Sequence, residues 1–121
     1  MKEPTVTFED NYVHIRHPKG DVFSPESTHC TLHRAFDLCA LTRCRRILEE
    51  AEAPVRRQDP ESVAAMIGGF SLLSGLKLAR CFYGYQTDSL SEHLVNVAAS
   101  HGLTLRFFGD RDEALQWLGA K

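Results

Sequence analysis

The stretch LRFFGDRDEALQWL, Leu105–Leu118, contains the end of one strand and the whole of one helix. Phe107 and Phe108 end the segment Leu103–Phe108, which is typical of a core strand. Asp110 then has the side chain of a helix N-cap, with Glu113 three residues later as its capping-box partner. A core strand that runs directly into a capped helix indicates an α/β protein.

The apolar residues of this last helix lie on one side of it. Leu115 and Leu118 share that side with Ala114, and Trp117 lies at its edge. We therefore expect the helix to pack back onto the sheet and to bury Trp117, Leu118 and Phe107 together.

Strands and helices alternate along the rest of the chain in the same way. Residues 5–17 alternate apolar and polar side chains around Asp10-Asn11, which predicts a β-hairpin. Its buried face carries Val6, Phe8, Val13 and Ile15. Cap residues and apolar periodicity predict helices at 25–42, at 60–73 and from Ser89 until Gly102, with strands at 47–51, 76–83 and 103–108. The order predicts a single α/β domain over residues 1–121, with a mixed, mostly parallel sheet, an N-terminal β-hairpin and helices packed on it.

Composition excludes several classes of protein. The 121 residues suffice for one core, and a formal charge of −2 with both signs spread along the chain argues against nucleic-acid binding. The start of the chain lacks the apolar run of a signal peptide, and no stretch approaches the roughly 20 apolar residues of a membrane-spanning helix. We expect a cytoplasmic protein without an integral membrane segment, which leaves peripheral membrane contact and the oligomeric state open.

The order of the elements and the closing LRFFGDRDEALQWL resemble the SpoIIAA-like proteins of the STAS superfamily, whose fold is related to the CRAL-TRIO lipid-binding domains. The resemblance implies a bacterial, regulatory, non-catalytic domain that binds a partner protein or a small apolar or lipid-like ligand. STAS anti-sigma-factor antagonists carry a phosphorylatable Ser in a turn with a second Ser and glycine. Here that region reads EEAEAPVRRQDPESVAAM, Glu49–Met66, where Ser62 stands without them. A phospho-regulated switch through Ser62 is the alternative function.

A small hydrolase that uses a Cys or His is a third hypothesis, which no motif favours. The cysteines contain no Cys-x-x-Cys pair, so we expect them reduced and without metal. Cys30 and Cys39 fall on a predicted helix and Cys81 in a predicted core strand, so we expect these three to be buried. The sequence predicts no cofactor. The cysteines are Cys30, Cys39, Cys44 and Cys81.

Histidines and acids offer two further candidate sites. His29 and His33 lie four residues apart on one helix face, but no third metal ligand accompanies them, so we interpret them as solvated. His14 and His17 lie on opposite faces of a strand. The acids Glu49, Glu50 and Glu52 are interpreted as a solvated strand end.

The carboxyl ends of the parallel strands are the place where open α/β sheets bind ligands. We expect the binding surface to include Glu50, Arg56, Arg57, Ser62, Tyr83 and Tyr85. Tyrosines beside arginines suit a ligand that has an anionic head and an apolar body.

Overall fold

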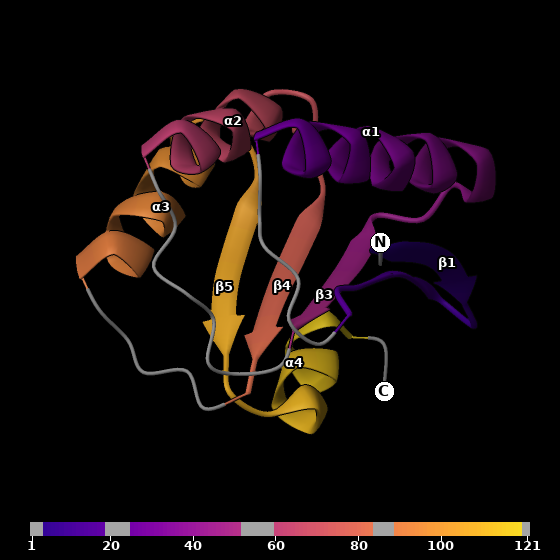
Figure 1. Cartoon of the computed structure of the whole chain (residues 1–121). Helices are drawn as coiled ribbons and strands as arrows, with labels where there is room; N and C mark the ends of the chain where they lie inside the picture. The colour runs from indigo at the N-terminus through magenta and orange to yellow at the C-terminus, as the bar shows by residue number, and fades with distance from the viewer. Residues whose placement is uncertain (1–3, 19–24, 52–59, 84–88, 120–121) are drawn as a thin grey trace.

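The computed structural model describes residues 4–18, 25–51, 60–83 and 89–119, and for residues 25–27 and 60–63 it describes the backbone alone (Figure 1). Five strands and four helices follow one another along the chain. They are β1 (Thr5–Glu9), β2 (Tyr12–Arg16), α1 (Pro25–Thr42), β3 (Arg46–Ala51), α2 (Pro60–Phe70), β4 (Lys77–Phe82), α3 (Ser89–Ser100), β5 (Thr104–Phe108) and α4 (Arg111–Leu118).

The five strands form one sheet in the order β1-β2-β3-β4-β5. β1 and β2 form the N-terminal hairpin and are antiparallel, whereas β2, β3, β4 and β5 are parallel. The predicted α/β fold is therefore confirmed as one small domain with a mixed, mostly parallel sheet. Because the parallel strands share a direction, their carboxyl ends meet at one edge of the sheet and their amino ends at the other.

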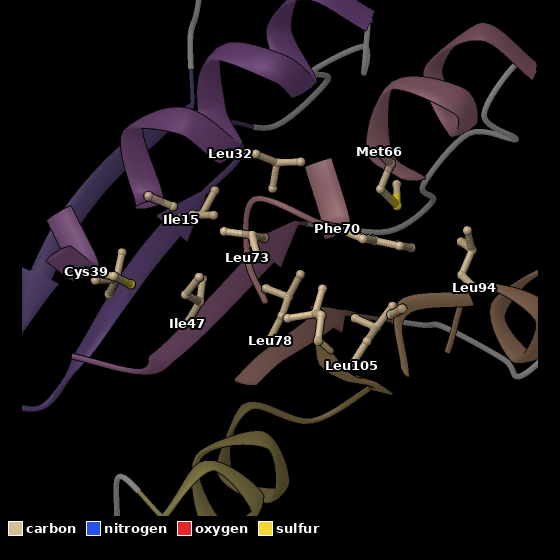
Figure 2. Packing of buried hydrophobic residues seen from close by; sticks show 14 residues of the cluster. Ile15, Leu32, Cys39, Ile47, Met66, Phe70, Leu73, Leu78, Leu94 and Leu105 are labelled. Carbon is tan, nitrogen blue, oxygen red and sulfur yellow. The ribbon is translucent and has the colours of Figure 1, made fainter. Parts of the chain in front are cut away.

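The helices divide between the two faces of the sheet. α1, α2 and α3 lie side by side on one face, and α4 packs against β3, β4 and β5 on the other (Figure 1). The core beneath α1–α3, shown in Figure 2, is the larger. It contains Val13, Ile15, Leu32, Ala35, Cys39, Ile47, Met66, Phe70, Leu73, Leu78, Leu94, Ala98, Leu103 and Leu105.

The second core lies between α4 and the sheet. It contains Tyr12, Leu48, Ala79, Cys81, Phe108, Ala114, Leu115 and Leu118. Neighbouring residues of one strand divide between the two cores because strand side chains alternate between faces. Ile47 belongs to the first core and Leu48 to the second.

The last helix packs as predicted, with one correction. Asp110 caps α4 by accepting a hydrogen bond from the backbone N–H of Asp112 at 3.0 Å. The aromatic partner of Trp117 is Phe108, whose ring centroid lies 5.6 Å away, and the expected grouping with Phe107 is wrong. Phe107 points to the opposite face and packs against the larger core. Trp117 itself is half-buried.

Three details differ from the sequence-based expectations. Phe8, expected in the buried face of the hairpin, is 43% exposed because β1 is the outermost strand of the sheet. α2 ends at Phe70 rather than at residue 73, and a turn over residues 71–75 follows it. Cys30 is exposed, whereas Cys39 and Cys81 are buried as expected.

Adjacent glycines in α2 provide a matched pair of substitutions. A Cβ atom at Gly69 would overlap Leu32 Cδ1 of α1, whereas a Cβ atom at Gly68 would meet no atom within 4 Å. We expect Gly68→Ala to raise the free energy of unfolding by about 0.5–1 kcal/mol, because alanine favours the helix. Gly69→Ala should lower it by about 1–3 kcal/mol through overpacking. Urea denaturation measures both, and equal shifts would show that α1 and α2 do not meet closely at Gly69.

Candidate functional site

Two glutamates are buried side by side near the carboxyl end of β3. Glu49 is 5% exposed and Glu50 is 7% exposed. Their side chains leave the strand on opposite faces of the sheet, and each gathers its own set of polar partners. The interpretation of these acids as a solvated strand end is therefore wrong for Glu49 and Glu50, and Glu52 lies outside the described residues.

Glu49 lies on the α1–α3 face and is bound to a cation on the neighbouring strand. Arg80 is its direct partner in the register of β3 and β4. Arg80 Nε donates to Glu49 Oε1 at 2.8 Å, and Arg80 Nη2 donates to Oε2 at 3.3 Å. His17 Nε2 lies 2.7 Å from the same Oε2. All three side chains are more than nine-tenths buried, so they form a closed ionic group inside the protein.

The partners of Glu49 determine its charge. Burial alone would raise its pKa, but the charge of Arg80 and hydrogen bonds from His17 and Arg80 outweigh burial and lower the pKa to about 2. Arg80 also donates to Met66 Sδ at 2.9 Å, and its guanidinium lies 4.6 Å from the ring centre of Phe82. The carboxylate and the guanidinium are thus both ionised and both enclosed.

Glu50 forms a second network on the α4 face. His14 Nε2 lies 2.6 Å from Glu50 Oε1, and the hydroxyl of Tyr83 donates to Oε2 at 2.5 Å. Arg111, the first residue of α4, lies 3.6 Å from Oε1 through its Nε atom. Its Nη2 atom donates to the hydroxyl of Tyr12 at 2.9 Å. One carboxylate therefore connects β2, the end of β4 and the start of α4.

The Glu50 network shifts the ionisation of its members. Burial would raise the pKa of Glu50, but hydrogen bonds from His14 and Tyr83, with the charges of His14 and Arg111, lower it to about 2. An ionised carboxylate accepts hydrogen bonds only, so the hydrogen in the short contact with His14 belongs to Nε2. Burial and the bond to Glu50 raise the pKa of Tyr83, which keeps its hydroxyl protonated as the donor.

Only two of the expected site residues can be placed with their side chains. Glu50 and Tyr83 are brought together by a direct hydrogen bond. Ser62 lies in the first turn of α2 with its backbone alone described, and its phosphorylation stays a prediction. Arg56, Arg57 and Tyr85 lie outside the described residues.

The sequence reasoning missed most members of the two networks. These are Tyr12, His14, His17, Glu49, Arg80 and Arg111. One signal in the sequence points to part of them. Glu49 in RILEEA and Arg80 in KLARCF carry opposite charges at the fourth position of two strands, next to apolar residues, which is typical of a buried cross-strand pair.

Other candidate sites have simpler surroundings. His29 and His33 stack on α1 with ring centroids 4.3 Å apart, and both are exposed, as expected for a solvated helix face. Within residues 4–18, 25–51, 60–83 and 89–119, no three His, Cys, Asp or Glu side chains are grouped so as to hold a metal ion. Burial is the main cause that raises the pKa of Cys39 to about 12 and that of Cys81 to about 11, so both thiols stay protonated near neutral pH.

A small enclosed cavity lies beside the Glu49 group, under α1 and α2. Its volume is about 10 Å³, which is room for about one water molecule. Its lining residues are His17, Thr28, Thr31, Leu32, Glu49, Met66, Leu78 and Arg80. A cavity of this size does not admit an organic ligand.

Comparison of the chain with protein-family models, with curated proteins and with solved structures found no match. No helix in the described part of the chain has the length and apolar character that a membrane span requires.

Proposed function

We propose that this chain is a non-catalytic, regulatory binding domain of the SpoIIAA-like type, which docks a partner protein through the carboxyl edge of β3 and β4. One observation carries the proposal. Glu50 holds an exposed tyrosine, Tyr83, and an exposed arginine, Arg111, in fixed positions at that edge. Tyr83 is 36% exposed, and the Arg111 side chain is 45% exposed.

Tyrosine and arginine are, with tryptophan, enriched among the side chains that dominate the affinity of protein interfaces. Their contribution is larger when they are already ordered, because less side-chain entropy is lost on binding. Tyr83 is ordered by its bond to Glu50, and Arg111 by its bond to Tyr12. A rigid pair of this kind supports docking of a protein surface.

A partner protein fits the described geometry better than a lipid-like ligand. A drug-sized or lipid-like molecule requires a cavity of roughly 300–1,000 Å³. Among the residues that the structure describes, which leave out 52–59 and 84–88 at this edge, the cavity beside the carboxyl ends of the strands has a volume of about 10 Å³. We therefore place the partner protein first and test the amphiphile directly.

The absence of catalysis is supported by how the reactive groups are held. His14 and His17 each direct Nε2 to a buried carboxylate rather than to an open pocket. The thiol of Cys81 is buried, with its pKa raised to about 11 by burial and by the charge of Glu50. A general base or a thiolate nucleophile needs access to the substrate and a pKa near the working pH.

Affinity capture from the source cells, followed by direct binding of the purified partner, tests this function. We expect Tyr83→Ala and Arg111→Ala each to weaken the partner's affinity by about tenfold or more, as for interface residues that dominate binding. His29→Ala, at an exposed position of α1, is the control and should leave affinity within about twofold.

Two outcomes would contradict the proposal. If the His29 variant loses the partner while both edge variants keep it, the docking surface lies elsewhere. If native mass spectrometry finds a co-purified amphiphile that is released on denaturation, and no partner depends on Tyr83 or Arg111, the domain binds a small ligand instead. The melting temperature of each variant separates lost binding from lost fold.

A further inference from the structure

A second surface lies at the opposite edge of the sheet, where β3 and β4 begin. It is an open depression of about 630 Å³, within the usual volume range of small-molecule sites. The hairpin turn, the ends of α1 and α4, and the first residues of β3 and β4 surround it. Its lining residues are Phe8, Asp10, Asn11, Thr42, Arg43, Cys44, Arg45, Arg46, Gly75, Lys77 and Leu118.

The depression is strongly cationic in a chain whose formal charge is −2. Four of its lining residues are basic, Arg43, Arg45, Arg46 and Lys77, and one is acidic, Asp10. The carboxyl ends of α1 and α4 each add a partial charge of about −0.5. A local charge of about +2 remains after the carboxylate and both helix ends are counted.

Two of the four cations are fixed to the helix that they border. Arg46 Nε donates to the carbonyl oxygen of Leu118 at 2.9 Å, and Lys77 Nζ donates to that of Trp117 at 3.2 Å. Arg43 and Arg45 are exposed, and neither guanidinium makes a hydrogen bond or an ion pair with any described residue. Within the described part of the chain, the donors of both guanidinium groups are therefore open to a ligand.

The backbone of Arg43 provides an independent observation. Arg43 follows α1 directly and has a φ of +57°, and the N–H of Cys44 bonds to the carbonyl of Cys39 at 3.0 Å. This is a helix ending in which glycine is the usual residue, because other residues are strained in the left-handed region. Strained residues of this kind are concentrated at ligand sites and switch regions, so the φ of Arg43 motivates a search for a function here.

We propose that this depression binds the dianionic phosphate group of a phosphate monoester, with Arg43 and Arg45 as its main donors. The guanidinium fork matches two phosphate oxygens, and a dianion balances the local charge of about +2. The depression exceeds the size of a phosphate ion, so the organic part of the monoester lies against the exposed ring of Phe8.

Isothermal titration calorimetry with inorganic phosphate and with phenyl phosphate tests the site. We expect phenyl phosphate to bind more tightly, and the double variant Arg43→Gly/Arg45→Gln to weaken its affinity by about tenfold or more. Arg16→Gln/Arg106→Gln changes the net charge equally at exposed positions outside the depression and should change affinity by less than about twofold. Equal weakening by both double variants, or no binding to the unmodified protein, would overturn the proposal.

Two variants separate this site from folding and from the proposed function. Arg43→Gly alone should raise the melting temperature while it weakens phenyl phosphate binding, because glycine relieves the strained φ. Tyr83→Ala, at the opposite edge of the sheet, should leave phosphate binding unchanged. A loss of phosphate binding in Tyr83→Ala would contradict a separate site.

The pH dependence of affinity and the alkylation rate of Cys44 are two further readouts. The second pKa of phosphate monoesters is near 6, so affinity should be higher at pH 8 than at pH 5.5. Cys44 lines the depression and Cys30 is exposed outside it, so bound phenyl phosphate should slow the alkylation of Cys44 by iodoacetamide but not that of Cys30. Equal alkylation rates with and without phenyl phosphate would contradict binding at this place.

A phosphate monoester group also ends the lipid phosphatidic acid. Sedimentation with phosphatidylcholine vesicles, with and without phosphatidic acid, distinguishes this source from a soluble ligand. Binding to the acidic vesicles that Arg43→Gly/Arg45→Gln abolishes would identify a lipid headgroup as the source. A supernatant that retains the protein, together with calorimetric binding of phenyl phosphate, would identify a soluble monoester.

Discussion

Replacing Glu49 with alanine is expected to lower the free energy of unfolding by about 3–5 kcal/mol, the usual cost of breaking a buried ion pair. The substitution leaves the guanidinium of Arg80, which is 2% exposed, inside the protein without the carboxylate that neutralises it. His17 loses its short contact at the same time. Small domains have a total stability of roughly 5–15 kcal/mol, so this variant should be largely unfolded at moderate urea concentrations.

Two further variants separate the ion pair from general damage at this position. Glu9→Ala removes a carboxylate whose side chain is 47% exposed and should change stability by less than about 0.5 kcal/mol. Glu49→Leu combined with Arg80→Met removes both charges and should recover part of the loss, since apolar pairs often replace buried ion pairs without penalty. If Glu49→Ala and Glu9→Ala unfold at the same urea concentration, the buried ion pair does not stabilise the fold.

Acid is expected to destabilise the protein by several kcal/mol between pH 4.5 and pH 2. Glu49 and Glu50 both have a pKa lowered from 4.5 to about 2, after their charged partners and hydrogen bonds outweigh burial. A lowered pKa in the folded state means that the carboxylates stabilise the fold fully above pH 4.5. That stabilisation is lost as the pH falls toward 2, by an upper figure of roughly 3 kcal/mol for each group.

Urea denaturation at pH 7, 5, 4 and 3 measures this dependence. Glu50→Gln should make the unfolding free energy vary less with pH, because one of the two shifted groups is removed. Glu113→Gln, at an exposed position of α4, should leave the pH dependence unchanged. A stability that is constant from pH 5 to pH 3 in the unmodified protein would show that the two carboxylates are not held in their charged form.

The sequence was sufficient to predict the elements because their signals are local. The Asp110 cap, the apolar stripe of α4 and the alternation of residues 5–17 each act over a few residues, and the structure confirms the corresponding elements. The partner of Trp117 was not predictable in this way. It depends on which face of the sheet α4 packs against after β5. Neighbouring residues of a strand point to opposite faces, so the choice of face decides whether Phe107 or Phe108 contacts Trp117.

The candidate site was predicted only where it depends on the direction of the strands. Parallel strands bring their carboxyl ends together, and Glu50 and Tyr83 do meet there. The burial of Glu49 was missed because it requires the register of β3 against β4, which places Arg80 directly opposite. The sequence around Glu49 shows only a run of acids. The strand and the helices that exclude water from Glu49 come from distant parts of the sequence.

The position of α4 has a consequence for the synthesis of this protein. Leu48, Ala79 and Phe108 are covered by a helix that leaves the ribosome after all five strands, although β3 leaves it roughly sixty residues earlier. At translation rates of about 5–20 residues per second, one face of the nascent sheet stays uncovered for roughly 3–12 seconds. Exposed apolar strands are the surfaces that chaperones bind and through which chains aggregate, so a nascent chain stalled before Arg111 should be retained by chaperones, whereas the chain that includes α4 should be released.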